Sequence, residues 1–160
     1  MLVIAKWPFQ DKIMCTTMPG DPPTVLLIDD ELSLLVLLRA ALRRAGFDVY
    51  TASNGSEGER EALLHMPDII VSDVMMPPPD GFELRQRLAE NPTTRNIPFI
   101  FLTARTDPAE KHRALEGGAS DYITKPFERE ELIARIRAAL RRQYWQRQAE
   151  YPTEGTLNGR

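Results

Sequence analysis

Polar and charged side chains stand at the ends of four short apolar segments in this sequence. They are Asp29, Asp30, Asp73, Thr103 and Lys125. If the segments are parallel strands of one open sheet, their carboxyl ends share one edge, where ligands bind in such sheets. We therefore expect three carboxylates, a hydroxyl and an ammonium group to meet in one site.

Electrostatics indicate what this set of groups needs. Two carboxylates about 4 Å apart repel by about 4 kcal/mol at an effective dielectric near 20, so three must take up protons or hold a cation. Mg²⁺ fits best, because it accepts one or two carboxylates together with waters and phosphate oxygens. No histidine or cysteine lies at these strand ends, which argues against zinc.

Beside a magnesium ion, Asp73 is a candidate nucleophile toward phosphorus, since aspartyl phosphates are a known covalent intermediate. Phosphoryl transfer needs mainly positioning and neutralisation of the equatorial oxygens. Mg²⁺ would cover one oxygen, Lys125 a second and the Thr103 hydroxyl a third. We expect the turn "MPPPDG" to aim the Met75 carbonyl at the metal, and Gly81 to give the backbone freedom to enter the next helix.

A purely structural interpretation of the same residues is also open. Asp29 or Asp30 could simply cap the helix that follows. Thr103 could be an ordinary residue at a strand end, and Lys125 a solvated one. The joint occurrence at several strand ends favours a functional site.

Elements of two alternating kinds would position these residues. Short apolar segments, rich in β-branched and aromatic residues, are predicted as strands at 24–28, 48–52, 68–72, 98–103 and 121–124. Segments with helical periodicity are predicted as helices at 31–46, 56–66, 81–91, 108–118 and 128–145. This alternation predicts a parallel α/β three-layer sandwich, and the nearly continuous apolarity of the central strands predicts helices on both faces.

Composition narrows the class of protein. Twenty basic residues stand against 23 acidic ones, for a net charge of −3, so a general nucleic-acid or membrane surface is not expected. Cys15 is the only cysteine, which favours a reducing, cytoplasmic location, and no run reaches the roughly 20 apolar residues of a membrane span. We expect residues 1–23 to be a poorly structured extension, 24–142 a compact domain, and 143–160 a helix end followed by a tail or linker.

Four motifs, in this order and spacing, resemble the receiver domain of two-component response regulators: "LLIDDE", "SDVMMPPPDGFEL", "FLTAR" and "GASDYITKPF". The resemblance covers about residues 24–142 and implies a flavodoxin-like (βα)5 fold with strand order 2-1-3-4-5. It implies that Asp73 is the phosphoacceptor, and that Mg²⁺ is bound by Asp30, Asp73 and the Met75 carbonyl, with Asp29 acting through water. Thr103 and Lys125 would contact the phosphoryl group, and Pro126 would follow a cis bond that helps to aim the lysine.

The resemblance also implies a switch and a dimer surface. Thr103 would move toward the phosphoryl group, and Tyr122 would swing inward behind it. The last 22 residues of the domain look like receivers of the winged-helix transcription-factor class, which dimerise through helix 4, strand 5 and helix 5. Carried over, Lys111 would pair with Glu131, and Asp121 with Arg135, across a two-fold axis. The alternative is a solvated charged face that contributes little.

The leading functional hypothesis is therefore a phosphorylation-activated switch. It would accept a phosphoryl group from a histidine kinase or phosphotransfer protein, catalyse only its own phosphorylation and dephosphorylation, and control a partner or output domain. An aspartyl-phosphate phosphatase is the alternative, but that chemistry usually wants a second acid where Met75 stands. A scaffold that kept the fold without the chemistry is disfavoured by the complete set of strand-end residues. No direct nucleic-acid binding is expected of this segment, since 18 residues after Arg142 cannot build a winged-helix domain.

Overall fold

Five strands alternate with five helices in the computed structural model, which describes residues 21–104 and 108–150. The strands are β1 (Thr24–Ile28), β2 (Asp48–Ala52), β3 (Ile69–Asp73), β4 (Phe99–Thr103) and β5 (Asp121–Thr124). The helices are α1 (Leu32–Arg44), α2 (Gly55–His65), α3 (Gly81–Glu90), α4 (Pro108–Glu116) and α5 (Arg129–Glu150). Each element lies within a few residues of its predicted place, apart from the far end of α5.

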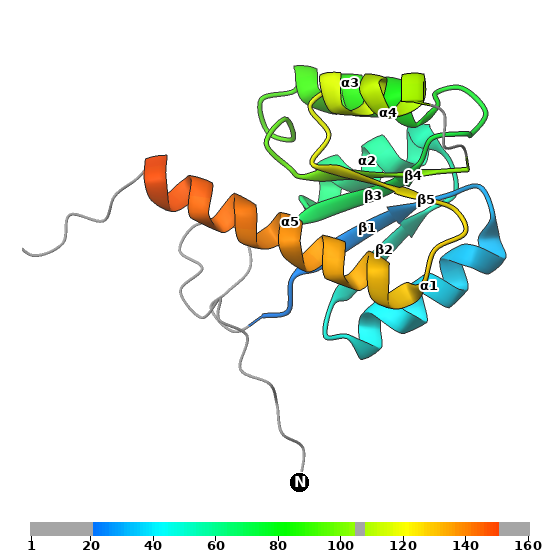
Figure 1. The fold of residues 1–160 in the computed structure, drawn as a ribbon, viewed down its shortest axis with the longest axis horizontal. Coiled ribbons are helices and arrows are strands. Elements are labelled where there is room, and N and C mark those ends of the chain that lie inside the picture. Colours follow the sequence, from blue (N-terminus) through cyan, green and yellow to red (C-terminus); the bar gives the residue numbers. More distant parts are fainter. Residues whose placement is uncertain (1–20, 105–107, 151–160) are drawn as a thin grey trace, which may run out of the picture.

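The strands form one parallel sheet in the order β2-β1-β3-β4-β5, as predicted (Figure 1). The order reverses beside β1, because the chain first adds β2 on one side and then β3, β4 and β5 on the other. All carboxyl ends therefore point to one edge of the sheet. Residues that follow β1, β3, β4 and β5 are thus brought close together.

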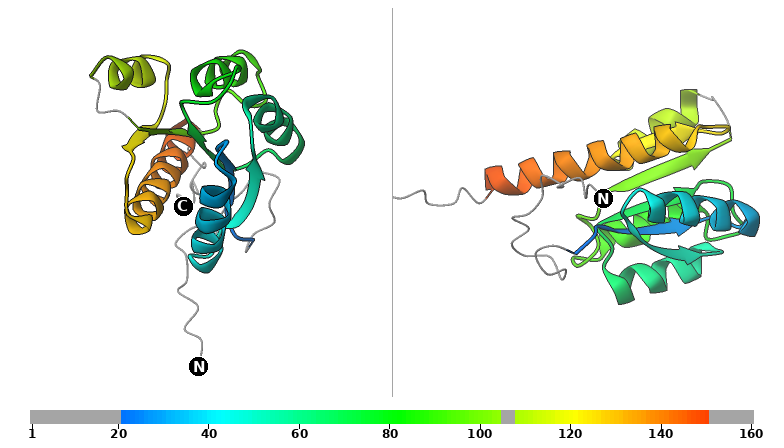
Figure 2. Two further views of the ribbon diagram at one scale, coloured as in Figure 1. Left: turned by 90° about the vertical axis from the view of Figure 1, so that its right-hand side faces the viewer. Right: turned by 90° about the horizontal axis from the view of Figure 1, so that it is seen from below.

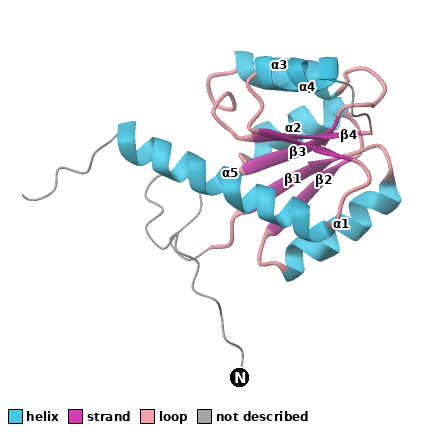
Figure 3. Ribbon diagram, viewed as in Figure 1, coloured by secondary structure: helices cyan, strands magenta, loops and turns pink. Residues whose placement is uncertain are grey.

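Helices cover both faces of the sheet (Figures 2 and 3). One apolar cluster joins α1 and α5 to the first face, and a second joins the opposite face to α2, α3 and α4. Each residue of β3 and β4 is buried, as are four of the five in β1. The near-continuous apolarity of these strands follows from this double coverage.

Side chains at the helix starts explain where two of the helices begin. The Asn54 side chain accepts a hydrogen bond from the Glu57 N–H at 2.8 Å and caps α2. Asp80 and Glu83 form a capping box at the start of α3, in which each side chain accepts a backbone N–H at 2.9 Å. These caps satisfy N–H groups that the first helical turn leaves unpaired.

The end of α5 was predicted too early. We expected the helix to end at residue 145, whereas α5 continues to Glu150 (Figure 1). Residues 143–150 contain no glycine or proline, and six of the eight are glutamine, arginine, alanine or glutamate, which are good helix formers, so helix propensity alone favours continuation. Residues 1–20 and 151–160, which include most of the predicted extension and tail, lie outside the described residues. None of the described helices combines the length and apolarity that crossing a lipid bilayer requires.

Candidate functional site

The sheet brings all five strand-end residues to one edge. Asp73 and Thr103 are the last residues of β3 and β4, while the other three directly follow β1 or β5. The Lys125 N–H donates a 2.6 Å hydrogen bond to the Thr103 carbonyl, which ties the end of β4 to the segment after β5. The convergence predicted from strand-end positions is therefore present.

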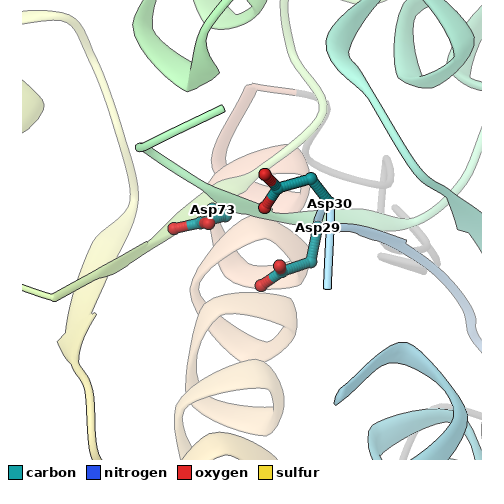
Figure 4. Close-up of side chains that lie close together, drawn as sticks. All are labelled: Asp29, Asp30 and Asp73. Atoms are coloured by element: carbon teal, nitrogen blue, oxygen red, sulfur yellow. The ribbon is translucent and has the colours of Figure 1, made fainter. Parts of the chain in front are cut away.

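Three carboxylates form the acidic part of the site. One oxygen from each of Asp29, Asp30 and Asp73 lies within 4.8 Å of the others. Figure 4 shows the three side chains close together. Asp29 is 1% exposed and Asp73 6%, whereas Asp30 is exposed to solvent. The cluster thus combines two buried carboxylates with one that faces the solvent.

Lys125 lies against the two buried acids. Its Nζ is 2.9 Å from Asp29 Oδ2 and 3.6 Å from Asp73 Oδ1. Burial lowers the pKa of Lys125, but its hydrogen bond to Asp29 and the neighbouring negative charges outweigh burial and raise that pKa above its ordinary value. The lysine therefore remains a cation and partly balances the cluster.

The surroundings of Asp73 destabilise the ionised form of its carboxyl group. Burial, followed by the negative charge of Asp29, raises the pKa of Asp73 to about 6, although Lys125 and the Met75 backbone N–H oppose the shift. A raised pKa of this kind marks a carboxylate that gains from further positive charge. The surroundings of Asp73 therefore favour the approach of a cation.

Oxygen donors and excess negative charge make the cluster suitable for Mg²⁺. One lysine does not neutralise three carboxylates, and two of the three acids are buried. Asp29, Asp30 and Asp73 supply the hard carboxylate ligands that this ion prefers. The residues present therefore fit the metal.

Neither aspartate after β1 acts as a helix cap. The N-cap of α1 is Glu31, which makes no side-chain capping bond. Asp29 Oδ1 instead accepts the Glu31 N–H at 2.9 Å, which holds the Asp29 carboxylate at the edge of the sheet. The capping interpretation of these two residues is thus wrong, and both remain available to the site.

The turn after β3 is held close beneath Asp73. The Gly81 N–H donates to the Val74 carbonyl at 3.1 Å, and a Cβ on Gly81 would collide with the Asp73 carbonyl oxygen. We predicted that Gly81 serves by its backbone freedom, but its φ lies outside the left-handed region, so its role is to leave space. The Pro78–Pro79 and Lys125–Pro126 peptide bonds are both cis, the second as predicted.

Thr103 is buried, and its hydroxyl is engaged by α4. The Oγ1 atom donates to Glu110 Oε2 at 3.1 Å, and the residue is 4% exposed. Sequence reasoning missed Glu110, because nothing in the spacing of seven residues shows how the chain returns from β4 to α4. The hydroxyl of Thr103 thus has an identified acceptor on a neighbouring helix.

Tyr122 lies close to this contact. It is partly buried, and the Lys111 Nζ lies 5.1 Å from the centroid of its ring, which is cation–π distance. Tyr122, Thr103 and Glu110 line one small cavity between the sheet and α4. The two predicted switch residues are therefore neighbours.

The predicted dimer residues form ion pairs within the single chain. Both Asp121 oxygens lie 3.0 Å from Arg135 Nη1, and Glu131 Oε1 lies 3.5 Å from Arg135 Nη2. Lys111 belongs to the same side of the molecule but contacts Tyr122. The two-fold pairing of these residues stays a prediction.

Comparison with known proteins agrees with this geometry. Residues 25–137 match the family described as the response regulator receiver domain. The chain belongs to this family. Receiver domains are phosphorylation-activated switches of two-component signalling, and histidine kinases or phosphotransfer proteins are their partners.

Relatives of this receiver domain include longer regulators. The phosphate regulon transcriptional regulatory protein PhoB of Rhizobium meliloti is 43% identical over 120 residues, which are 75% of this chain and 53% of PhoB. The DNA-binding dual master transcriptional regulator RpaA of Synechocystis is 42% identical over 75% of this chain and 50% of its own length. The chain spans about half the length of these curated relatives.

Solved receiver structures share the fold. A response regulator from Chloroflexus aurantiacus has a TM-score of 0.71 and 37% identity over 75% of this chain and 98% of its own. The chemotaxis protein CheY4 of Vibrio cholerae has a TM-score of 0.71 and 31% identity over 74% of this chain and 98% of its own. The flavodoxin-like fold inferred from the motifs is confirmed.

Proposed function

We propose that Asp73 is the phosphoacceptor of this receiver domain. One Asp73 carboxylate oxygen attacks the phosphorus of a phosphohistidine, a P–O bond forms as the P–N bond breaks, and the electron pair leaves with the imidazole nitrogen. The observation that supports this most is the place of Asp73, at the end of β3 between two further acids and 3.6 Å from Lys125. No second carboxylate stands two residues further on, where Met75 is, as a general acid–base for hydrolytic turnover.

Asp30, Asp73 and the Met75 carbonyl are proposed to hold Mg²⁺, with Asp29 in support through water. When bound, the ion would supply charge neutralisation on a phosphoryl oxygen. The raised pKa of Asp73 supports this assignment, because the carboxylate must be ionised to act as a nucleophile. Asp29 has a further role, since its 2.9 Å contact orients Lys125 beside Asp73.

Lys125 and Thr103 are proposed to bind the phosphoryl oxygens. The Lys125 Nζ already lies 3.6 Å from Asp73 Oδ1, so it needs only a small movement to reach an oxygen of a phosphoryl group on Asp73. The Thr103 hydroxyl must first exchange Glu110 for that oxygen. This exchange is the step that couples phosphorylation to α4.

Tyr122 is proposed to follow Thr103 inward. It borders the cavity that Thr103 and Lys111 also line, and the Lys111 Nζ lies 5.1 Å from the centroid of its ring. Inward movement of Tyr122 would release Lys111 from the ring. Phosphorylation at one edge would thereby change the outer surface of α4 and β5.

That surface is the proposed dimer interface. Arg135, Asp121 and Glu131 already form a charged group on β5 and α5, and Lys111 adds a cation from α4. A partly exposed pair of this kind stabilises a single chain only weakly. Exchange of partners between Lys111 and Glu131, and between Asp121 and Arg135, would join two copies at little electrostatic cost.

The signalling context is proposed from the family. A histidine kinase or phosphotransfer protein would supply the phosphoryl group, and the receiver domain would catalyse its own phosphorylation and dephosphorylation. Both relatives described above are named as transcriptional regulators. By analogy, the altered α4–β5 surface would control an output domain or partner.

Intact-mass spectrometry after incubation with Mg²⁺ and acetyl phosphate tests the proposal. We expect one phosphoryl adduct on the native chain and none on Asp73→Asn. Asp48→Asn is the matched control, because Asp48 is an exposed aspartate on β2 outside the cluster, and it should label like the native chain. An adduct that persists in Asp73→Asn, or steady phosphoester turnover with no adduct, would refute the assignment.

A further inference from the structure

An arginine lies on the buried face of α3. Arg85 is 9% exposed and shares that face with Leu84 and Leu88, which are buried in the core. Burial lowers the pKa of Arg85, and no neighbouring charge offsets that effect. A cation buried without an acidic partner is costly, so its presence calls for an explanation.

The contacts of Arg85 compensate its burial only in part. Nη2 donates to the Gly118 carbonyl at 3.1 Å, and the guanidinium carbon lies 5.9 Å from the centre of the Phe99 ring. Nε is buried and has no hydrogen-bond partner, and no carboxylate in the described part of the chain pairs with the guanidinium. Arg85 therefore carries a positive charge that these residues leave unneutralised.

Arg85 borders a cavity of about 340 Å³ at the end of the sheet where β4 and β5 begin. Two further arginines line it, Arg95 from the loop before β4 and Arg142 from α5, and both are exposed. None of the described residues that line the cavity is acidic. Three arginines thus line one concave space in a chain whose net charge is negative.

Neutral hydrogen-bonding groups complete the cavity. Asn96, Ser120, Gln143 and Gln146 line it beside the arginines. Gln143 Nε2 donates to the Asn96 carbonyl at 3.1 Å, which joins α5 to the loop before β4 across the cavity. This volume is within the range of small-ligand sites, and guanidinium groups bind phosphate and carboxylate oxygens in a bidentate manner.

We propose that this cavity, the Arg85–Arg95–Arg142 pocket, binds a small anion that carries phosphate or carboxylate groups. Arg95 and Arg142 bind the anion from the rim, and Arg85 supplies the buried charge that attracts it. The pocket lies at the opposite end of the sheet from Asp73, so it is a second site, separate from phosphoryl transfer. Since it joins α3, α5 and the starts of β4 and β5, occupancy stabilises the packing of α5 against the domain.

Calorimetric titration with pyrophosphate, and separately with citrate, tests the proposal at constant ionic strength in EDTA. EDTA keeps the acidic cluster free of metal, so that cluster repels both probes. We expect saturable binding of at least one probe, a rise in Tm under saturation, and shifts of the Gly118 and Ser120 amide signals. The affinities of the pocket for pyrophosphate and for citrate, compared with each other, distinguish a phosphate ligand from a carboxylate ligand.

Variants separate the pocket from general charge effects. Arg95→Gln with Arg142→Gln should weaken binding by about 10-fold or more, and Arg85→Met should abolish the rise in Tm caused by the anion. Arg39→Gln removes an exposed arginine of α1 and should bind like the native chain. Acetyl phosphate should label all these variants at the native rate, which keeps this test independent of the proposed function. Absence of saturable binding, or an equal loss in Arg39→Gln, would overturn the proposal.

Discussion

The metal-free acidic cluster should make the protein less stable as pH rises, and Asp73→Asn should remove this loss. The pKa of Asp73 is about 6 in the folded protein, against an ordinary value of 3.8. Because the folded-state pKa is the higher one, the unfolded chain releases this proton first. The contribution of Asp73 to stability is therefore greatest below pH 4 and is lost as pH rises through 6. The difference between these two pKa values corresponds to about 3 kcal/mol, and Asp73 is too buried for solvent to reduce this figure greatly.

Urea denaturation in EDTA at several values between pH 4 and 8 measures the effect. Other acids titrate alike in both proteins, so the difference in the free energy of unfolding between Asp73→Asn and the native chain isolates Asp73. We expect this difference to grow by about 2.4 kcal/mol in favour of the variant between pH 4 and 7.5, because part of the effect is already present at pH 4. Asp48→Asn, which alters an exposed aspartate, should show no such growth.

The effect of Mg²⁺ on stability is a second test of the same cluster. A ligand that binds only the folded state stabilises it in proportion to its affinity. Saturating Mg²⁺ should therefore stabilise the native chain more than Asp73→Asn and close the gap at pH 7.5. A difference that stays flat with pH, or one that Mg²⁺ leaves unchanged, would refute the argument that burial and repulsion at Asp73 make this site receptive to a cation.

Three further predictions concern the switch, the dimer and the turn. Glu110→Gln weakens the hydrogen bond that retains the Thr103 hydroxyl by about 1 kcal/mol, so acetyl phosphate should label this variant about fivefold faster than the native chain. Glu116→Gln, on the same helix, should leave the labelling rate unchanged. Arg135→Glu places like charges on the proposed interface, and phosphorylation-dependent dimers should weaken by about 10-fold or more in sedimentation; undiminished dimers would exclude the interface. Gly81→Ala forces a methyl group against the β3 backbone and should cost about 2–3 kcal/mol in denaturation, whereas an unchanged midpoint would show that the turn relaxes freely.

The sequence by itself determined the fold and the edge of the sheet that carries the candidate site. A strand covered on both faces must be apolar throughout, so β1, β3 and β4 stand out as short apolar segments. The end of such a segment is where polar residues can begin, which made Asp73 and Thr103 recognisable. Parallel topology then places every strand end on one edge, whatever the details of packing.

Only the tertiary structure decided which groups touch. The 2.9 Å contact between Lys125 and Asp29 joins residues that are 96 positions apart, and the contact between Thr103 and Glu110 depends on the path of a connecting loop. The position of Arg85 is a similar case, because its charge is typical of a solvated helix face while its place beside Leu84 and Leu88 buries it. Backbone pattern specifies where an element lies, whereas side-chain contacts depend on the distances between elements, and those distances are set only when the whole core packs.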